Sequence, residues 1–194
     1  MKRATQRQET RRRVVDRATR LCRRDGFIRT RTADVAAAAG LSHGAVFVHF
    51  PTREQLLQEV AERMGSRITD RLYALAAANA KLDEQLRAQL QCIEEEEDLY
   101  RHLVIENALL PLEVQAVWTG ILSAIATHLS TALTSAMESG AIRRAPLHLV
   151  FNMWIGLVHH YVIHKALFVS KGSVLRKHGP ELVDFFLYLM AKGS

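Results

Sequence analysis

Cysteine is scarce in this chain of 194 residues, which contains only Cys22 and Cys92. Two cysteines are too few for a scaffold held together by disulfides. We find no apolar run of membrane-spanning length, and the N-terminal segment MKRATQRQETRRR offers no apolar stretch for a signal peptide. These absences predict a cytoplasmic protein without a membrane partner.

The sequence also lacks the motifs of the common enzyme classes. It contains no phosphate-binding glycine loop, no Gly-x-Ser-x-Gly elbow and no paired-cysteine motif. Because nothing places a nucleophile next to a general base, we expect no enzymatic activity and no cofactor.

Positive charge is concentrated near the N-terminus. Residues 1–60 contain 13 Lys and Arg against 6 Asp and Glu, whereas the remaining residues contain 13 against 14. Lys2, Arg3, Arg7 and the run Arg11–Arg13 precede or start the first expected helix. These cations can neutralise phosphates and release counterions whatever the base sequence, which favours DNA as a partner. A solvated basic tail is the alternative interpretation.

A short helix and a tight turn are predicted between residues 30 and 41. Thr30 or Thr32 can cap the helix, and Gly40 can end it because glycine tolerates a left-handed backbone. The alanines at positions 36–39 let a second helix approach closely. This is the pattern of the corner in a helix-turn-helix motif.

A second short helix is predicted over residues 42–50, with Ser42 as its cap and Pro51 just beyond its end. Thr52 and Gln55 then form a capping box that opens a third helix. Upstream, a supporting helix ends near Gly26. Its apolar stripe consists of Val14 or Val15, Ala18, Leu21 and Cys22. We expect these four helices to share one small core.

The segment from Arg13 to Leu57 resembles the DNA-binding domain of TetR-type repressors. The matching positions are Ala18, Leu21, Gly26, Phe27, Thr30, Asp34, Val35, Ala36, Ala39, Gly40, Leu41, Ser42, Gly44, Phe47, His49, Phe50, Leu56 and Leu57. The resemblance implies backbone contacts from His49 and Arg53. Members of this family usually carry a tyrosine at position 47 that touches a phosphate, and Phe47 lacks that hydroxyl.

The helix over residues 42–50 would lie in the major groove of a double-stranded operator and read it with small or weakly polar side chains. Direct readout would therefore use few hydrogen bonds, and DNA shape would contribute to the sequence preference. The residues expected at the DNA are Arg13, Thr30, Arg31, Ser42, His43, Gly44, Ala45, Phe47, His49 and Arg53.

Helical periodicity continues through the rest of the chain, so we predict an all-α fold. A long helix from Arg53 to Leu75 would act as a lever, and its pattern weakens around residue 79. Further helices are expected from Asp83, then over Leu99–Leu110, Leu112–Ser139, Leu147–Val169 and Pro180–Ala191. The five acids Glu94–Asp98 are read as a solvated face, with a cation-binding role as the alternative.

Two domains are predicted: an N-terminal helix-turn-helix domain at residues 1–52, and an effector-binding and dimerisation domain at residues 53–194. The family resemblance implies a homodimer, built on the last two long helices, and a small hydrophobic effector that releases a palindromic operator. The candidate effector-binding residues are Trp118, Leu122, Ile125, His128, Phe151, Trp154, Ile155 and His160.

Two other functions stay open from the sequence. His160 and His164 are four residues apart on a helix and could present two imidazoles to a metal ion, although no second half of a metal motif is present. An architectural DNA-binding protein without an effector is the other alternative. The length of the second domain argues against it, because a pure DNA binder has little need for over a hundred further residues.

Overall fold

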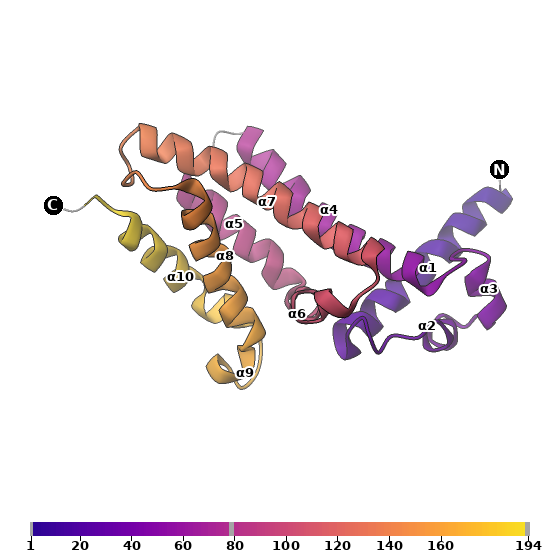
Figure 1. Cartoon of the computed structure of the whole chain (residues 1–194). Coiled ribbons are helices and arrows are strands. Elements are labelled where there is room, and N and C mark those ends of the chain that lie inside the picture. Colours follow the sequence, from indigo (N-terminus) through magenta and orange to yellow (C-terminus); the bar gives the residue numbers. More distant parts are fainter. Residues whose placement is uncertain (1, 78–79, 193–194) are drawn as a thin grey trace. The chain divides into compact units, whose positions relative to one another are not determined.

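The computed structural model describes residues 2–77 and 80–192, and every regular element in this part of the chain is helical (Figure 1). The elements are α1 (Lys2–Asp25), α2 (Thr32–Ala39), α3 (His43–Phe47), α4 (Arg53–Ala77), α5 (Leu82–Glu95), α6 (Glu97–Glu106), the 3-10 turn η1 (Asn107–Leu109), α7 (Leu112–Glu138), α8 (Leu147–Ile163), α9 (Lys165–Phe168) and α10 (Val174–Met190). The predicted all-α fold is confirmed. The weakened pattern around residue 79 lies outside the described residues.

The chain divides into two compact units. Unit 1 comprises residues 1–65 and 98–119, and unit 2 comprises residues 66–97 and 120–194. The sequence suggested a boundary between Thr52 and Arg53, which would assign all of α4 to the second domain. In the structure the first half of α4 and most of α6 belong to unit 1, so this unit is larger than a helix-turn-helix alone.

The core of unit 1 is built on the apolar stripe of α1. Val14, Ala18 and Cys22 recur every four residues and are fully buried, because this spacing puts all three on one face of the helix. Apolar residues of the neighbouring helices and of the segments that join them complete this core: Phe27, Val35, Val46, Phe50, Leu56 and Leu57 are all buried. The expected shared core of four helices is confirmed.

In unit 2, α5 packs against α10, and α8 also packs against α10. Trp154 of α8 is buried and donates its Nε1–H to Gln89 Oε1 of α5 at 2.7 Å. Its ring lies 5.0 Å from that of Phe186 in α10. A buried indole needs such an acceptor, so one aromatic residue joins three helices.

Two helices of unit 2 differ from the sequence prediction. The last helix starts at Val174 rather than Pro180, because Ser173 caps it by accepting the Arg176 N–H at 2.9 Å. Pro180 therefore lies inside the helix. The single helix expected over Leu147–Val169 ends at Ile163, and the short helix α9 follows.

The acidic run Glu94–Asp98 is not a uniformly solvated face, so that prediction is wrong for two of its members. Glu96 and Glu97 are 5% and 4% exposed. Glu97 accepts hydrogen bonds from the N–H groups of Val174 and Leu175 at 3.1 and 3.0 Å. Lys165 Nζ lies 3.0 Å from the same carboxylate. These donors replace water around the buried charge.

Helix α7 meets the length and apolar composition of a membrane-spanning segment, contrary to the expectation from the sequence. A core helix can meet the same criteria. Ile121, Ile125, Leu129 and Leu133 of this helix are buried, whereas Thr127 and Thr131, on its other side, are exposed.

Candidate nucleic-acid interface and effector cavity

The loop after α1 is held by hydrogen bonds that involve a buried threonine. Gly26 adopts φ +92°, and the Thr30 hydroxyl donates to its carbonyl at 2.7 Å. Thr30 is 3% exposed, so its side chain supports the loop and is not presented to a phosphate. The predicted capping of α2 by Thr30 or Thr32 is wrong. Arg31 occupies the cap position without a side-chain hydrogen bond, and Thr32 Oγ1 lies 2.9 Å from His43 Nε2.

The corner between α2 and α3 follows the sequence prediction. Gly40 adopts the left-handed conformation at φ +65°, and the Leu41 N–H donates to the Ala36 carbonyl at 3.0 Å. Ser42 Oγ accepts the Ala45 N–H at 3.2 Å. The second helix is shorter than expected: α3 ends at Phe47, and residues 48 and 49 form a turn.

Most of the residues expected at the DNA are accessible. Six are exposed: Arg13, Arg31, Ser42, His43, Gly44 and Phe47. Three are half-buried: Ala45, His49 and Arg53. Val48, which was not among the predicted DNA-contacting residues, is 65% exposed directly after α3. Its position off the apolar stripe formed by Val46 and Phe50 could have revealed it.

Arg53 is tied to the backbone of the loop that precedes α2. Its Nε donates to the Thr30 carbonyl at 2.8 Å, and one Nη donates to the Phe27 and Ile28 carbonyls at 2.6 and 3.0 Å. Arg53 therefore positions α2 relative to the start of α4. A guanidinium has five N–H groups, so it can still offer hydrogens to a phosphate.

Arg11 connects α1 to the end of the helix-turn-helix. It donates to the His49 carbonyl at 2.9 Å, lies 4.2 Å above the Phe50 ring and pairs with Glu59 of α4. Burial, followed by the charges of Arg7 and Arg11, lowers the pKa of His49 below its usual value of 6.5. From the sequence, Arg11 was only one cation of a basic run. Its structural contacts could not be predicted, because the partners are 38 to 48 residues away in the chain.

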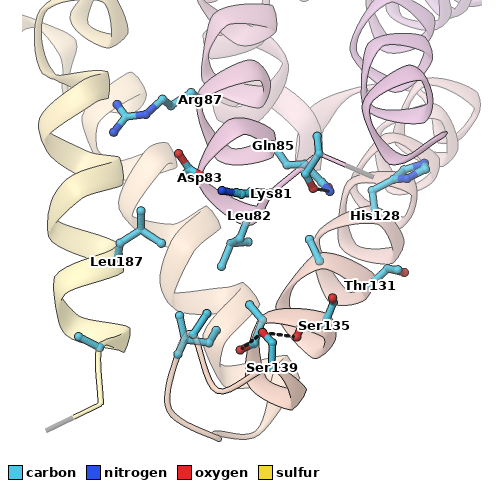
Figure 2. A pocket seen from close by; sticks show the side chains of 16 residues that line it. Lys81, Leu82, Asp83, Gln85, Arg87, His128, Thr131, Ser135, Ser139 and Leu187 are labelled. Atoms are coloured by element: carbon cyan, nitrogen blue, oxygen red, sulfur yellow. Dashed lines mark hydrogen bonds between the residues drawn. The ribbon is translucent and has the colours of Figure 1, made fainter. Parts of the chain in front are cut away.

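A cavity of about 700 Å³ opens in unit 2 among α5, α7 and α10 (Figure 2). Of the predicted effector residues, His128 lines it, with its ring 4.2 Å from that of Tyr73. The other seven lie elsewhere. Ile125, Trp154 and Ile155 are buried, Leu122 and Phe151 are half-buried, His160 is exposed, and Trp118 belongs to unit 1, where it contacts Tyr100. Their roles stay predictions.

The histidine pair of α8 was the main metal candidate. The rings of His160 and His164 lie 4.8 Å apart. Within residues 2–77 and 80–192, no group of three or more His, Cys, Asp or Glu side chains is arranged to hold a metal ion. Burial raises the pKa of Cys22 to about 12, as expected for a core thiol that is neither a nucleophile nor a ligand.

A segment of the sequence that lies in unit 1 matches known transcription regulators. The family model described as bacterial regulatory proteins of the tetR family matches residues 14–60. An HTH-type transcriptional repressor from Mycobacterium tuberculosis (strain ATCC 25618 / H37Rv) is 35% identical over 75 residues, which are 39% of this chain and 40% of that protein. The chain spans about 40% of the length of the curated relatives that it matches first.

Solved structures share the fold over most of the chain. A transcriptional regulator from Saccharomonospora viridis, in complex with choline, has a TM-score of 0.79 at 20% identity and covers 93% of this chain and 96% of its own. The regulator FadR from Bacillus subtilis, in complex with stearoyl-CoA, has a TM-score of 0.73 at 19% identity and covers 94% and 98%. The matched proteins are regulators, in agreement with the expectation of a non-enzyme. Residues 14–60 therefore match the tetR family of bacterial regulatory proteins, and most of the chain shares its fold with solved transcriptional regulators.

Proposed function

We propose that this regulator is a ligand-responsive repressor that binds a palindromic operator as a homodimer. The observation that carries the proposal is the geometry of α2 and α3. Gly40 and Ser42 fix a tight corner, and the residues at the start of α3 remain exposed. Operator binding requires contact with the nucleoid, so a cytoplasmic location is part of the proposal.

The surface of α3 suits a base readout with few hydrogen bonds. Ser42 and His43 offer polar atoms, while Val48 exposes apolar surface that can contact thymine methyl groups. Arg13 and Arg31 are exposed and can neutralise phosphates. Phosphate contacts of this kind position the helix, and the residues at its start then select the sequence.

An exposed apolar surface on α8 and α10 supports dimerisation. Leu149 and Met153 of α8 are 58% and 38% exposed, and Phe185 and Tyr188 of α10 are 51% and 75% exposed. Each pair lies on one face of its helix, and the two helices pack against each other within the protomer. A second copy would cover this surface and hold two α3 helices about 34 to 36 Å apart, the spacing of successive major grooves.

The cavity of unit 2 supports an effector. Its volume of about 700 Å³ is in the range of small-molecule sites. The choline and stearoyl-CoA complexes show that two proteins of this fold bind organic ligands. An effector that prefers one conformation of unit 2 would shift the population away from the operator-binding state by its differential affinity. Helix α4 contributes to both units and would transmit the change.

The proposal is tested by footprinting the chain on DNA from its own promoter region and measuring the mass of the protein in solution. We expect a dimer that protects a pseudo-palindrome. Replacing His43 or Ala45 should change which bases are preferred, whereas Arg31→Ala should weaken binding to all sequences and flatten the salt dependence. A stable monomer bound to an asymmetric site would contradict the proposal.

A further inference from the structure

The cavity of unit 2 has polar atoms on its walls that nothing in the described part of the chain satisfies. Gln85 of α5 and His128 of α7 both line it, as Figure 2 shows, and they are 5% and 8% exposed. Gln85 Oε1 and His128 Nε2 are buried without a hydrogen-bond partner among the described residues. A buried polar atom without a partner is destabilising, so natural proteins rarely retain one without a function.

The free atom of Gln85 is an acceptor. Its amide nitrogen already donates to the Ala80 carbonyl at 2.9 Å, and this bond fixes which end of the side chain is oxygen. Gln85 Oε1 can therefore accept a hydrogen bond from an occupant of the cavity. The imidazole of His128 can present either a donor or an acceptor at Nε2, depending on the tautomer.

The hydroxyl groups on the α7 wall have the same preference. Thr131 Oγ1 donates to the Thr127 carbonyl at 3.1 Å, and Ser139 Oγ donates to the Ser135 carbonyl at 2.9 Å. A hydroxyl has only one hydrogen, so both groups offer lone pairs to the cavity. This wall, like Gln85, favours a ligand that donates hydrogen bonds and disfavours a carboxylate, which only accepts them.

The remaining lining residues are apolar, or they carry charges that are balanced by a charge of the opposite sign nearby. Leu82, Ile142 and Leu187 supply apolar surface. Arg87 is paired with Asp184, which leaves Lys81 and Asp83 as opposite charges in the lining. A neutral ligand with an apolar body matches these walls better than an ion of either sign.

We propose that this cavity binds a neutral, hydroxyl-bearing apolar compound, such as an alcohol or phenol, and that Gln85 is the residue that recognises its hydroxyl. The inference rests on the proposed function, because it identifies the chemical class of the effector. It also assigns a specificity-determining residue that the sequence analysis did not select.

The test compares probes that differ only in the polar group. The first two pairs are 1-octanol with 1-methoxyoctane and 4-butylphenol with 4-butylanisole. In each pair a hydroxyl is compared with its methyl ether, so that only the first compound can donate a hydrogen bond. Octanoate and octylammonium carry the two charges. Binding to the full-length protein is measured by calorimetry without DNA. We expect the hydroxyl member of at least one pair to bind about five- to tenfold more tightly than its ether, and both ions to bind more weakly.

Gln85→Met removes the acceptor and retains the length of the side chain. We expect the preference for alcohol over ether to fall to about one in this variant. Gln91→Met is the control for the same exchange on α5, since Gln91 is exposed and is not in the cavity lining. It should retain the preference. His128→Phe should reduce the preference, because it removes the second free polar atom.

Equal binding of alcohol and ether, tighter binding of either ion, an unchanged preference in Gln85→Met or no binding of any probe would overturn the inference. Because calorimetry is carried out without DNA, these outcomes are separate from operator binding. Selective binding of the alcohol without release of the operator would retain the assignment of the cavity and refute the release step of the proposed function.

Discussion

The loop after α1 requires glycine at position 26, and Gly26→Ala should be costly for two reasons. Gly26 adopts φ +92°, which residues with a side chain rarely adopt. A Cβ atom at this position would also overlap Glu106 Oε1 of α6. That carboxylate accepts the Ile28 N–H at 2.8 Å and lies 3.0 Å from His102 Nδ1. Alanine would therefore strain the backbone and displace the group that holds the loop.

The two costs can be assigned separate magnitudes. The left-handed backbone costs about 1–2 kcal/mol for a residue with a Cβ. A hydrogen bond to a charged group contributes about 1.5–3 kcal/mol. Gly26→Ala should thus lower the stability of unit 1 by roughly 2.5–5 kcal/mol. Gly40→Ala is the matched control, because Gly40 has φ +65° and nothing within 4 Å of its Cβ position, so only the strain of about 1–2 kcal/mol applies.

A double-mutant cycle with Glu106→Ala separates the two contributions. Without the carboxylate there is nothing to displace, so the double variant should be no less stable than Gly26→Ala alone. The coupling energy should then equal the loss in Glu106→Ala, about 1.5–3 kcal/mol. Urea unfolding gives the totals, and hydrogen exchange of the Ile28 amide reports the local opening. Additive losses would show that Glu106 does not hold this loop.

Three further predictions concern single side chains. Phe47→Tyr should tighten binding to all DNA sequences about two- to tenfold by adding a phosphate hydrogen bond, measured by fluorescence anisotropy; no change would place residue 47 away from the backbone. Arg53→Lys should lower the melting temperature more than Arg31→Lys, because lysine cannot reproduce the three carbonyl contacts of Arg53. Burial lowers the pKa of His159 to about 4. Unfolded His159 takes up its proton near pH 6.5, so stability should fall between pH 6.5 and 4; His159→Gln should remove part of this slope, unlike the exposed His148→Gln.

The parts of the fold that sequence reasoning found depend on near neighbours in the chain. The end of α2 at Gly40 is fixed by bonds from the Gly40 and Leu41 N–H groups to carbonyls three and five positions before them, and Ser42 caps α3 through the amide three positions after it. The same holds for the apolar stripe of α1, whose members are one helical turn apart. Such features leave a periodic or punctuating pattern in the sequence.

The parts that sequence reasoning missed depend on partners far along the chain. Thr30 looks like a helix cap, yet its own loop buries it and its hydroxyl bonds to Gly26. Gln85 looks like a surface residue of an amphipathic helix, yet it lines the cavity between α5 and α7. Which polar residues become buried is decided by packing, and the pattern of a single helix does not contain that information.

The acidic run and the start of α10 were both predicted incorrectly, and the two errors have one cause. The backbone leaves the helical conformation at Glu96, with φ −123° and ψ 22°, so Glu97 starts a new helix and points in another direction than the acids of α5. It then reaches the first amides of α10, 77 and 78 residues later, together with Ser173 Oγ at 2.5 Å. A helix N-terminus offers unpaired N–H groups and favours a negative charge. The amides therefore make burial of Glu97 tolerable, and Glu97 in turn stabilises a helix that begins six residues before Pro180.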